Sequence, residues 1–329
     1  MDTVSIGQVG GILTTSDTTF PPINFGQHRV VVVIPAFNEE RFIGSVVIKV
    51  KRYSVTVIVV DDGSTDDTAA IAASAGAIVV RQPKNMGKGE ALNAGFRKAF
   101  ELKPEAIVMI DADGQHLPEE LQAIVRPILN GEADVVVGSR YKKKYNVPIA
   151  RIFGHIFFNL LTSSMSGVFV SDSQSGYRAF SPRALENTSF HSKGFSVESE
   201  MQFLAHEKHL RVLEVPITIQ YTDPPKRSVF HQGLSVLNGV LRLTGQYRPL
   251  LFFGVTGLVM LIAGVSFGFV IVDRYVKTQQ LATGYGLICV LLSILGLVMM
   301  STGITLHSIR GLLQDIRQDI NNSIHHSKG

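Results

Sequence analysis

Two carboxylates one residue apart, Asp111 and Asp113, directly follow the apolar run at residues 106–110. A continuous apolar run of this length is typical of a strand buried in a parallel sheet. At the carboxyl end of such a strand both side chains can reach one divalent cation, and oxygen ligands suit Mg²⁺ or Mn²⁺ carrying a diphosphate. An acidic turn that caps the next helix would show the same two residues, so the pair alone does not distinguish the two interpretations.

Polar residues also end other predicted elements. Pro35 ends one β-branched strand and is followed by Glu39, while Asp61 and Asp62 end the next strand. Carboxylates there can hydrogen-bond a ribose or a base edge, but they equally suit the positive end of a following helix dipole. Glycines flank Lys88 at the expected start of a helix, which indicates either an anion cradle or a mobile surface loop.

Alternating elements are expected to position these clusters. The predicted strands are residues 30–34, 55–60, 77–80, 106–110 and 134–137, and the helices between them are residues 39–52, 65–75, 87–102 and 117–129. Strand–helix alternation with short links predicts a parallel sheet covered on both faces. Ligands of such sheets bind beyond the carboxyl ends of the strands, so the polar clusters should converge there. The later part of the domain is less regular, with helices expected at residues 149–161 and 195–208 and a strand at 211–220.

The composition is unusual for a soluble enzyme. Of 329 residues, 45% are hydrophobic and only 18% are charged, and the mean hydropathy is +0.22. These values indicate a globular domain with membrane segments. The net charge of +4 suits phosphate-bearing substrates or an anionic membrane surface, and no basic tract is dense enough to indicate nucleic-acid binding. With Cys289 as the single cysteine, the chain has neither an internal disulfide nor a cysteine-based metal site.

Two uncharged segments, residues 250–272 and 281–306, are each long enough to cross a hydrocarbon core of ~30 Å. Their succession predicts a transmembrane hairpin in contact with the lipid bilayer, with both flanks on the same side. The first 28 residues do not resemble a secretory signal, so we expect a flexible leader and a cytoplasmic catalytic domain at the cell (plasma) membrane. Residues 229–247 have helical apolar spacing, which is consistent either with an interfacial helix or with a helix packed on the domain.

Six motifs occur in order along the soluble part. They are Pro35-Ala36-Phe37-Asn38-Glu39, residues 59–66, Asn85-x-Gly87-Lys88-Gly89, Asp111-Ala112-Asp113-x-Gln115, Gly138-Ser139-Arg140 and Gln174-Ser175-Gly176-Tyr177-Arg178. Together they resemble glycosyltransferase family 2, in the GT-A fold, and within it the dolichyl-phosphate mannosyltransferase and polyprenyl-phosphate glycosyltransferase group. The resemblance covers about residues 30–219. It implies an α/β catalytic domain with a Rossmann-like, mixed but mainly parallel sheet, followed by an interfacial helix and a two-helix transmembrane hairpin.

The resemblance also implies roles for individual residues. Those placed on the nucleotide sugar are Pro35, Phe37, Glu39, Asp61, Asp62, Lys88, Asp111, Ala112, Asp113 and Arg140. The divalent metal, Mg²⁺ or Mn²⁺, would be held by Asp111, Asp113 and Gln115. The acceptor and its phosphate would meet Arg151, Ser175, Gly176, Tyr177, Arg178, Lys226 and Arg227, although Pro224-Pro225 departs from the usual glycine-containing loop before the last two. The residues expected to act in catalysis are Asp113, Arg140, Asp172 and Gln174.

The implied function is inverting, metal-dependent transfer of one sugar from a nucleotide sugar, of the GDP-mannose or UDP-glucose type, to dolichyl or polyprenyl phosphate. A hydroxyl acceptor needs a carboxylate base, whereas a lipid phosphate is already anionic and needs alignment and nearby cations. Residues 172–176 offer an amide and hydroxyls where hydroxyl-directed relatives carry an acidic pair, which favours the phosphate acceptor. Asp172, Glu198 and Glu200 nevertheless keep a base available.

The main alternatives are a processive or hydroxyl-directed synthase of the same superfamily and a non-catalytic nucleotide-sugar-binding membrane module. Processive members carry a Gln-x-x-Arg-Trp motif, and this chain has no tryptophan. The sequence leaves open the sugar, the nucleotide, the polyprenol and homo-oligomerisation. The expected organisation is a leader at residues 1–28, the catalytic domain at 29–222, a basic loop and interfacial helix at 223–248, the two spans within 249–307, and a cytoplasmic tail at 308–329.

Overall fold

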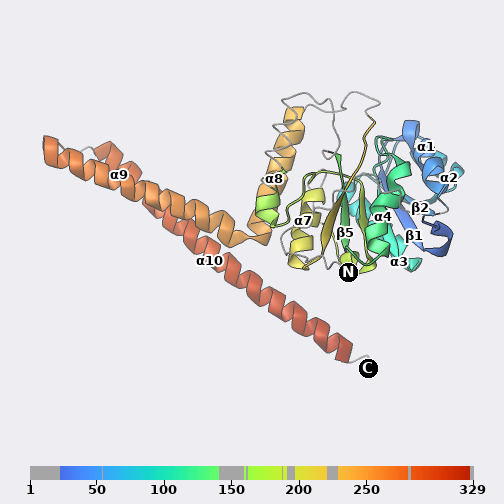
Figure 1. Cartoon of the computed structure of the whole chain (residues 1–329). Helices are drawn as coiled ribbons and strands as arrows, with labels where there is room; N and C mark the ends of the chain where they lie inside the picture. Colours follow the sequence, from blue (N-terminus) through green and yellow to red (C-terminus); the bar gives the residue numbers. More distant parts are fainter. Residues whose placement is uncertain are drawn as a thin grey trace, which may run out of the picture. The chain divides into compact units, whose positions relative to one another are not determined.

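The computed structural model describes residues 23–53, 55–140, 159–160, 162–186, 188–190, 197–220, 229–280 and 283–326. The chain divides into two compact units, Met1–Val240 and Leu241–Gly329 (Figure 1). The division falls inside helix α8 (Val229–Tyr247), later in the chain than the expected end of the catalytic domain at residue 222.

The first unit contains a seven-stranded sheet with the order β3-β2-β1-β4-β6-β5-β7. The strands are β1 (Val30–Ala36), β2 (Thr56–Asp61), β3 (Ile78–Arg81), β4 (Ala106–Met109), β5 (Val135–Ser139), β6 (Arg178–Phe180) and β7 (Val212–Pro216). Strand β6 runs antiparallel to both of its neighbours, β4 and β5, and the other pairings are parallel. The predicted mixed, mainly parallel sheet is therefore confirmed.

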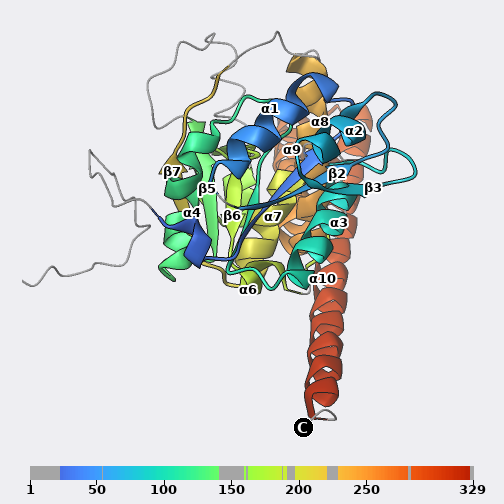
Figure 2. The same ribbon diagram turned by 90° about the vertical axis from the view of Figure 1, so that its right-hand side faces the viewer.

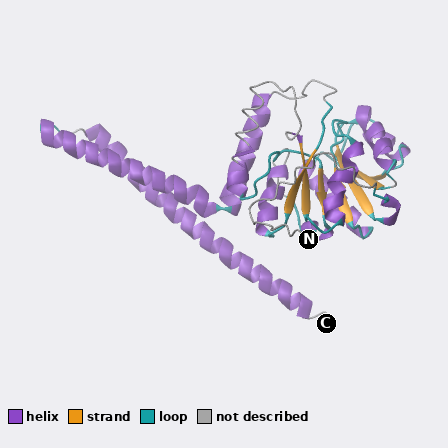
Figure 3. Cartoon of the chain, in the orientation of Figure 1, coloured by secondary structure: helices purple, strands orange, loops and turns teal. Residues whose placement is uncertain are grey.

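Helices cover both faces of this sheet (Figure 3). The helices are α1 (Glu40–Lys51), α2 (Thr68–Ser74), α3 (Lys88–Glu101), α4 (Leu121–Leu129), α6 (Pro182–Leu185) and α7 (Val197–Glu207), with short 3₁₀ turns at Phe25–Gln27 and Pro118–Glu120. Residues of α1, α2 and α4 share one apolar cluster with Val30, Val32 and Ile34 of β1. Residues of α3, α6 and α7 share the other with Val31 and Val33. Because side chains of a strand alternate between faces, the unbroken β-branched run of β1 fills both clusters.

Two local differences from the sequence prediction have physical causes. Helix α2 begins at Thr68, not Thr65, because the preceding residues bind the end of β1: the Asn38 N–H donates to Ser64 Oγ at 2.9 Å, and the Thr65 N–H donates to Asn38 Oδ1 at 2.9 Å. The expected strand at residues 211–220 stops at Pro216, which has no N–H to donate to a sheet ladder.

The second unit contains two long apolar helices. After a π-helical segment (Leu250–Val255), α9 spans Thr256–Thr278 and α10 spans Thr283–His326. The stretches Leu250–Thr278 and Thr283–Leu313 are long and apolar enough to cross a membrane, and each buries only 11% of its most apolar window. The two helices lie side by side, and α10 continues towards the C-terminus (Figure 1, Figure 2). Most of residues 308–329, expected as a tail, is thus helical, with α10 ending at His326.

Small residues bring α9 and α10 into close contact. A Cβ atom built on Gly296 would lie 2.7 Å from the Gly257 carbonyl oxygen, and one built on Gly264 would lie 2.5 Å from Ser293 Oγ. The Cys289 thiol donates to the Gly264 carbonyl at 3.1 Å. Close backbone approach of this kind is the usual way in which helices associate without a hydrophobic driving force.

This packing makes a disulfide prediction at Gly268, where an added Cβ would lie 3.3 Å from Cys289 Sγ. In Gly268→Cys, mild oxidation should close a bond between the helices in more than about half of the molecules, because this separation is close to that within a disulfide. Formation of the disulfide would be measured as the loss of maleimide labelling at both thiols and as an intact mass lowered by two hydrogens.

Phe269→Cys is the matched control, because Phe269 is 73% exposed on the neighbouring position. Its two thiols should stay free within the monomer. Equal intramolecular cross-linking of both variants would contradict the packing of α9 against α10.

Candidate active site

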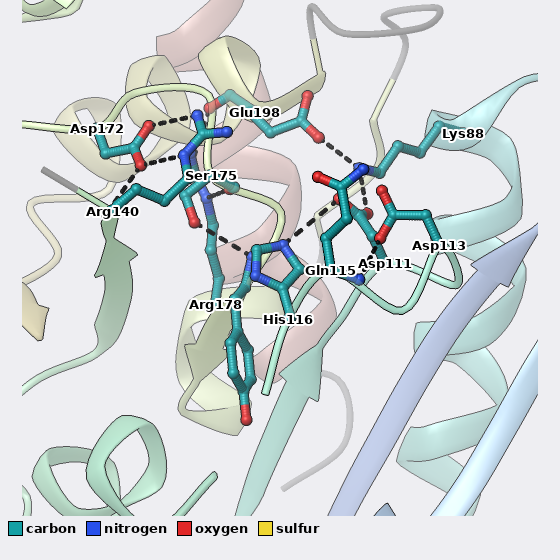
Figure 4. Close-up of polar contacts among 11 residues, drawn as sticks. Lys88, Asp111, Asp113, Gln115, His116, Arg140, Asp172, Ser175, Arg178 and Glu198 are labelled. Atoms are coloured by element: carbon teal, nitrogen blue, oxygen red, sulfur yellow. Dashed lines mark hydrogen bonds and ion pairs between the residues drawn. The ribbon is translucent and has the colours of Figure 1, made fainter. Parts of the chain in front are cut away.

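A half-buried lysine joins three elements at the carboxyl edge of the sheet. Lys88, the first residue of α3, donates from Nζ to Asp111 Oδ1 at 2.6 Å and to Glu198 Oε1 at 2.6 Å (Figure 4). Asp111 follows β4, and Glu198 lies in the first turn of α7. The ammonium therefore sits between two carboxylates whose positions are set by different elements.

The electrostatics of this cluster follow from burial and charge. Burial by itself would lower the pKa of Lys88, but Asp111 and Glu198 outweigh it and hold that pKa above its ordinary value. Burial would likewise raise the pKa of Asp111, yet Lys88 and His116 hold it well below its usual range. Asp113 differs, because burial and the neighbouring charge of Asp111 raise its pKa. Of the two aspartates, Asp111 is therefore firmly ionised, whereas Asp113 has too little positive charge nearby to offset its burial and the charge of Asp111.

The donor set suits a divalent cation. Asp113 Oδ1 accepts the Gln115 N–H at 3.0 Å across a turn in which Gly114 has a φ of +72°. Two carboxylates and an amide are hard oxygen ligands, and Mg²⁺ is commonly bound by one or two carboxylates together with substrate phosphates. Within the described ranges, no group of three or more His, Cys, Asp or Glu side chains is arranged to hold a metal. A cation bound here would thus need oxygens from a diphosphate or water, and it would relieve the repulsion that raises the pKa of Asp113.

Asp62 organises the loop that leads into α3. Its two carboxylate oxygens accept the backbone N–H groups of Met86 at 2.8 Å and Gly87 at 2.9 Å. Gly63, with a φ of +72°, packs so closely on this loop that an added Cβ would lie 2.4 Å from the Lys84 carbonyl carbon. These contacts hold the start of α3, and with it Lys88, against the end of β2.

The residues expected around the nucleotide lie along the same edge. Pro35 is in β1, and the ring of Phe37 just beyond it is 42% exposed. Asp61 is fully buried, accepts the Ser64 N–H at 2.9 Å and lies 3.1 Å from Arg81 Nε. The Glu39 N–H donates to Thr68 Oγ1 at 2.8 Å. Asp61 therefore holds its own turn together, whereas Phe37 presents its ring to the outside.

Arg140 and Asp172, both expected to act in catalysis, bind each other. Asp172 Oδ2 accepts from Arg140 Nε at 2.6 Å and from its backbone N–H at 3.1 Å, and Asp172 Oδ1 accepts from Arg140 Nη2 at 2.8 Å (Figure 4). Asp172 is completely buried. A carboxylate engaged on both oxygens by a guanidinium is a weak candidate for a general base, because the ion pair stabilises its ionised form.

Arg178 has a different position from the one expected of an acceptor-binding residue. Its guanidinium is buried and donates to three backbone carbonyls, those of Ser173 at 2.7 Å, Ser175 at 2.9 Å and Glu198 at 3.2 Å. Burial lowers the pKa of Arg178. These bonds attach the loop before β6 to the first turn of α7, so the observed role of Arg178 is to support the site from beneath.

The neighbouring residues of that loop also face inwards. Tyr177 is part of an apolar core cluster, with its ring centroid 5.3 Å from that of His116. Gly176 lies against the Asp111 carboxylate. Gln174 donates from Nε2 to Ser199 Oγ at 2.9 Å. The structure thus brings Gln174, Gly176, Lys88, Asp111, Asp113, Gln115, Arg140 and Asp172 to one region, while Arg151, Lys226 and Arg227 lie outside the described residues.

Two contributors were not assigned to this site from the sequence. Glu198 was considered only as one of three candidate bases, and His116, 3.8 Å from Asp111 through Nε2, was not considered. The available signals were weak: His116 directly follows Gln115, and Glu198 opens a predicted helix. Neither signal indicates a contact with Lys88 or Asp111 across the fold.

A mixed, mainly parallel α/β sheet with carboxylates at its carboxyl edge is the architecture expected of the GT-A fold. Residues 31–188 match the model of glycosyl transferase family 2. The chain is 35% identical to the UDP-N-acetylglucosamine–dolichyl-phosphate N-acetylglucosaminyltransferase of Methanococcus voltae, over 59% of this chain and 86% of that protein. The protein belongs to glycosyltransferase family 2, and the predicted family is confirmed.

Two further proteins are similar to this chain. A polyprenol monophosphomannose synthase of Mycolicibacterium smegmatis is 32% identical over 58% of this chain and 77% of its own length. The solved structure of glucosyl-3-phosphoglycerate synthase from Mycobacterium tuberculosis, in complex with Mn²⁺, UDP and phosphoglyceric acid, is 25% identical. Its TM-score is 0.54, and the match covers 68% of this chain and 80% of that one.

The contact between Gly176 and Asp111 makes a prediction. A Cβ atom at position 176 would lie 2.0 Å from Asp111 Oδ2, too close for any side chain. Gly176→Ala should therefore displace the Asp111 carboxylate and weaken binding of Mn²⁺ in the presence of a nucleoside diphosphate about tenfold or more. Titration followed by electron paramagnetic resonance of free Mn²⁺ measures this directly.

Gly131→Ala serves as the control, because nothing lies within 4 Å of its added Cβ but its φ is +70°. It should lower the free energy of unfolding by roughly 1–2 kcal/mol and leave Mn²⁺ binding unchanged. If Gly176→Ala bound Mn²⁺ as tightly as the unmodified protein, Asp111 would not be a metal ligand.

Proposed function

We propose that this glycosyltransferase transfers a single sugar from a nucleotide sugar to dolichyl or polyprenyl phosphate, with inversion at the anomeric carbon and with a divalent cation. The observation that carries the proposal is the clustering of Asp111, Asp113 and Lys88 at the sheet edge of a family 2 domain, in a chain with two apolar helices long enough to cross a membrane. Two relatives are named for transfer to dolichyl phosphate or for making a polyprenol phosphosugar.

The donor side rests on charge. Asp111, Asp113 and Gln115 would hold the cation, Mg²⁺ or Mn²⁺, on the diphosphate, and the M. tuberculosis structure contains Mn²⁺ with UDP. The cation supplies a positive charge that stabilises the departing nucleoside diphosphate. Lys88 would add a second positive charge at the same place. The exposed ring of Phe37, with Pro35 and Glu39 beside it, offers a surface on which the base can lie.

The acceptor side rests on the state of the carboxylates. Asp172 is held on both oxygens by Arg140, and Glu198 is held by Lys88. Neither of these two carboxylates is placed as a ready base, and a hydroxyl acceptor would need one. Glu200, the third candidate, is also buried. A lipid phosphate needs no deprotonation. It needs alignment and positive charge, so this arrangement supports the phosphate acceptor.

The membrane location follows from the second unit. Because two spans cross the membrane twice, the catalytic unit and the end of α10 would lie on the same side of the membrane. We propose that this side is the cytoplasm of the cell. Helix α8 would lie at the membrane interface, where the phosphate of a polyprenyl lipid is found. A hydroxyl-directed synthase or a non-catalytic module is supported by no further observation in the described residues.

Transfer can be measured with purified full-length protein in detergent. GDP-mannose, UDP-glucose and UDP-N-acetylglucosamine, each radiolabelled in the sugar, are supplied with a short polyprenyl phosphate and Mg²⁺ or Mn²⁺. One donor should yield label that partitions into organic solvent, and proton NMR should show the inverted anomer. The unphosphorylated polyprenol is the matched acceptor, and it should yield less than about a hundredth as much product because no base activates its hydroxyl. Insoluble polymer, or equal transfer to the alcohol, would contradict the proposal.

Asp113→Ala tests the metal in the same assay. It should abolish metal-dependent transfer, by at least about a hundredfold, while the thermal midpoint stays within a few degrees. Burial and the charge of Asp111 raise the pKa of Asp113, so the loss of this carboxylate should cost the fold little beyond its bond to the Gln115 N–H. Full activity of this variant would exclude Asp113 as a metal ligand.

A further inference from the structure

Two buried acceptor atoms near the start of α7 have no hydrogen-bond donor among the residues that the structure describes. Glu198 Oε1 accepts from Lys88, but Glu198 Oε2 has no partner within the described ranges, although the side chain is only 2% exposed. Gln174 Oε1 is likewise buried without a partner there. Buried polar atoms are nearly always hydrogen-bonded in folded proteins, so these two atoms require donors from water or from a ligand.

Gln174 is bonded to the first turn of α7, the turn that carries Glu198. Gln174 donates from Nε2 to Ser199 Oγ at 2.9 Å, and Ser199 adjoins Glu198 in α7. The Arg178 guanidinium binds the carbonyls on both sides of Gln174 and the carbonyl of Glu198. With Nε2 engaged by Ser199, Oε1 is the Gln174 atom that is left to accept a hydrogen bond.

The chemistry of these atoms restricts what they can bind. A carboxylate oxygen and an amide oxygen both accept hydrogen bonds, and the carboxylate repels anions. A phosphate group is therefore unsuited to this position, whereas a hydroxyl group is suited to it. Lys88 links Glu198 directly to Asp111, so the position adjoins the site proposed for the diphosphate, and the group bonded to that diphosphate is the sugar (Figure 4).

We propose that Glu198, together with the amide oxygen of Gln174, binds hydroxyl groups of the sugar being transferred and so selects the donor. The inference rests on the proposed function for the presence of a nucleotide sugar, but not on the lipid acceptor. It assigns Gln174, which the sequence analysis expects to act in catalysis, to the donor sugar. Glu198 then has two roles: one oxygen positions Lys88, and the other accepts from the sugar.

A positioning role alone makes a different prediction from sugar binding. If Glu198 only held Lys88, its replacement would change the affinities for a nucleoside diphosphate and for the nucleotide sugar by the same factor. If Glu198 also binds the sugar, the nucleotide sugar loses affinity relative to the diphosphate. Glu198→Gln is nearly isosteric and removes a negative charge, so binding of the anionic diphosphate should stay equal or become tighter.

The experiment is a calorimetric titration of the full-length protein with Mn²⁺ and two probes: the donor that gives lipid product in the panel above, and its free nucleoside diphosphate. In Glu198→Gln, the ratio of the two affinities should shift by about ten- to a hundredfold against the nucleotide sugar, as expected for losing a hydrogen bond to a charged group. Gln174→Leu should shift the ratio in the same direction by a smaller factor. A set of donors with single deoxy positions in the sugar would identify the contacted hydroxyl. The donor that lacks this hydroxyl should bind Glu198→Gln and the unmodified protein with the same weak affinity.

Asp134→Asn is the matched control. Asp134 is also a buried carboxylate, paired with Arg211 Nε at 3.1 Å, but it precedes β5 at the opposite edge of the sheet. It should lower stability without changing the affinity ratio.

An unchanged ratio in Glu198→Gln, or an equal loss for both probes, would overturn the proposal and leave Glu198 as a positioning residue for Lys88. If no donor gives lipid product, the probe is the nucleotide sugar that binds most tightly. If the affinity ratio then shifts as expected, the sugar site is supported and the lipid-phosphate acceptor is rejected. Binding of neither probe would reject both.

Discussion

The arrangement of the site depends on one charge that is largely removed from solvent, the ammonium of Lys88, whose side chain is 20% exposed. It is bonded at 2.6 Å to Asp111, at the end of β4, and at 2.6 Å to Glu198, in the first turn of α7. Isolated charges of this kind are costly to bury, and a carboxylate on each side compensates for that cost. The consequence is that α3, β4 and α7 must keep their mutual positions for any one of the three charges to be tolerated. The catalytic edge is thereby held together by its own electrostatics as well as by the two apolar clusters beneath it.

The antiparallel strand β6 positions the residues that support this arrangement. Inserted between β4 and β5, it carries Arg178 into the core, where the guanidinium binds the backbone of residues 173 and 175 and the carbonyl of Glu198. A strand of only three residues would be weak alone, but pairing on both edges and the buried arginine define its register. Gly176 completes the approach, since only a residue without a Cβ allows this loop to meet the Asp111 carboxylate.

The sequence predicted those parts of the fold and of the site that depend on residues close together in the chain. The strands that end at Pro35 and Asp61, and the one just before Asp111, are β-branched or apolar runs stopped by turn residues, so pattern alone identified them and the edge at which their polar residues meet. Strand β6 was missed because Arg178 lies in a polar segment and the strand exists only through pairing with distant neighbours. The bond from Lys88 to Glu198 joins residues 110 positions apart, which no local pattern encodes. A helical segment at residues 308–320 was anticipated, but not that it continues the second span as one helix, because loss of apolar character ends a span but does not end a helix.

The distribution of charge within the site bears on how a reaction could proceed there. Asp172 is neutralised by Arg140, and Lys88 is shared between Asp111 and Glu198, so the positive groups are already matched before any substrate arrives. Burial and the like charge of Asp111 raise the pKa of Asp113, so an added cation would stabilise this carboxylate. A diphosphate that brings a divalent cation adds little net charge to such a site, whereas a diphosphate alone would meet the carboxylates of Asp111, Asp113 and Glu198. The proposed requirement for a cation is therefore consistent with the protein's own charge balance as well as with the chemistry of the leaving group.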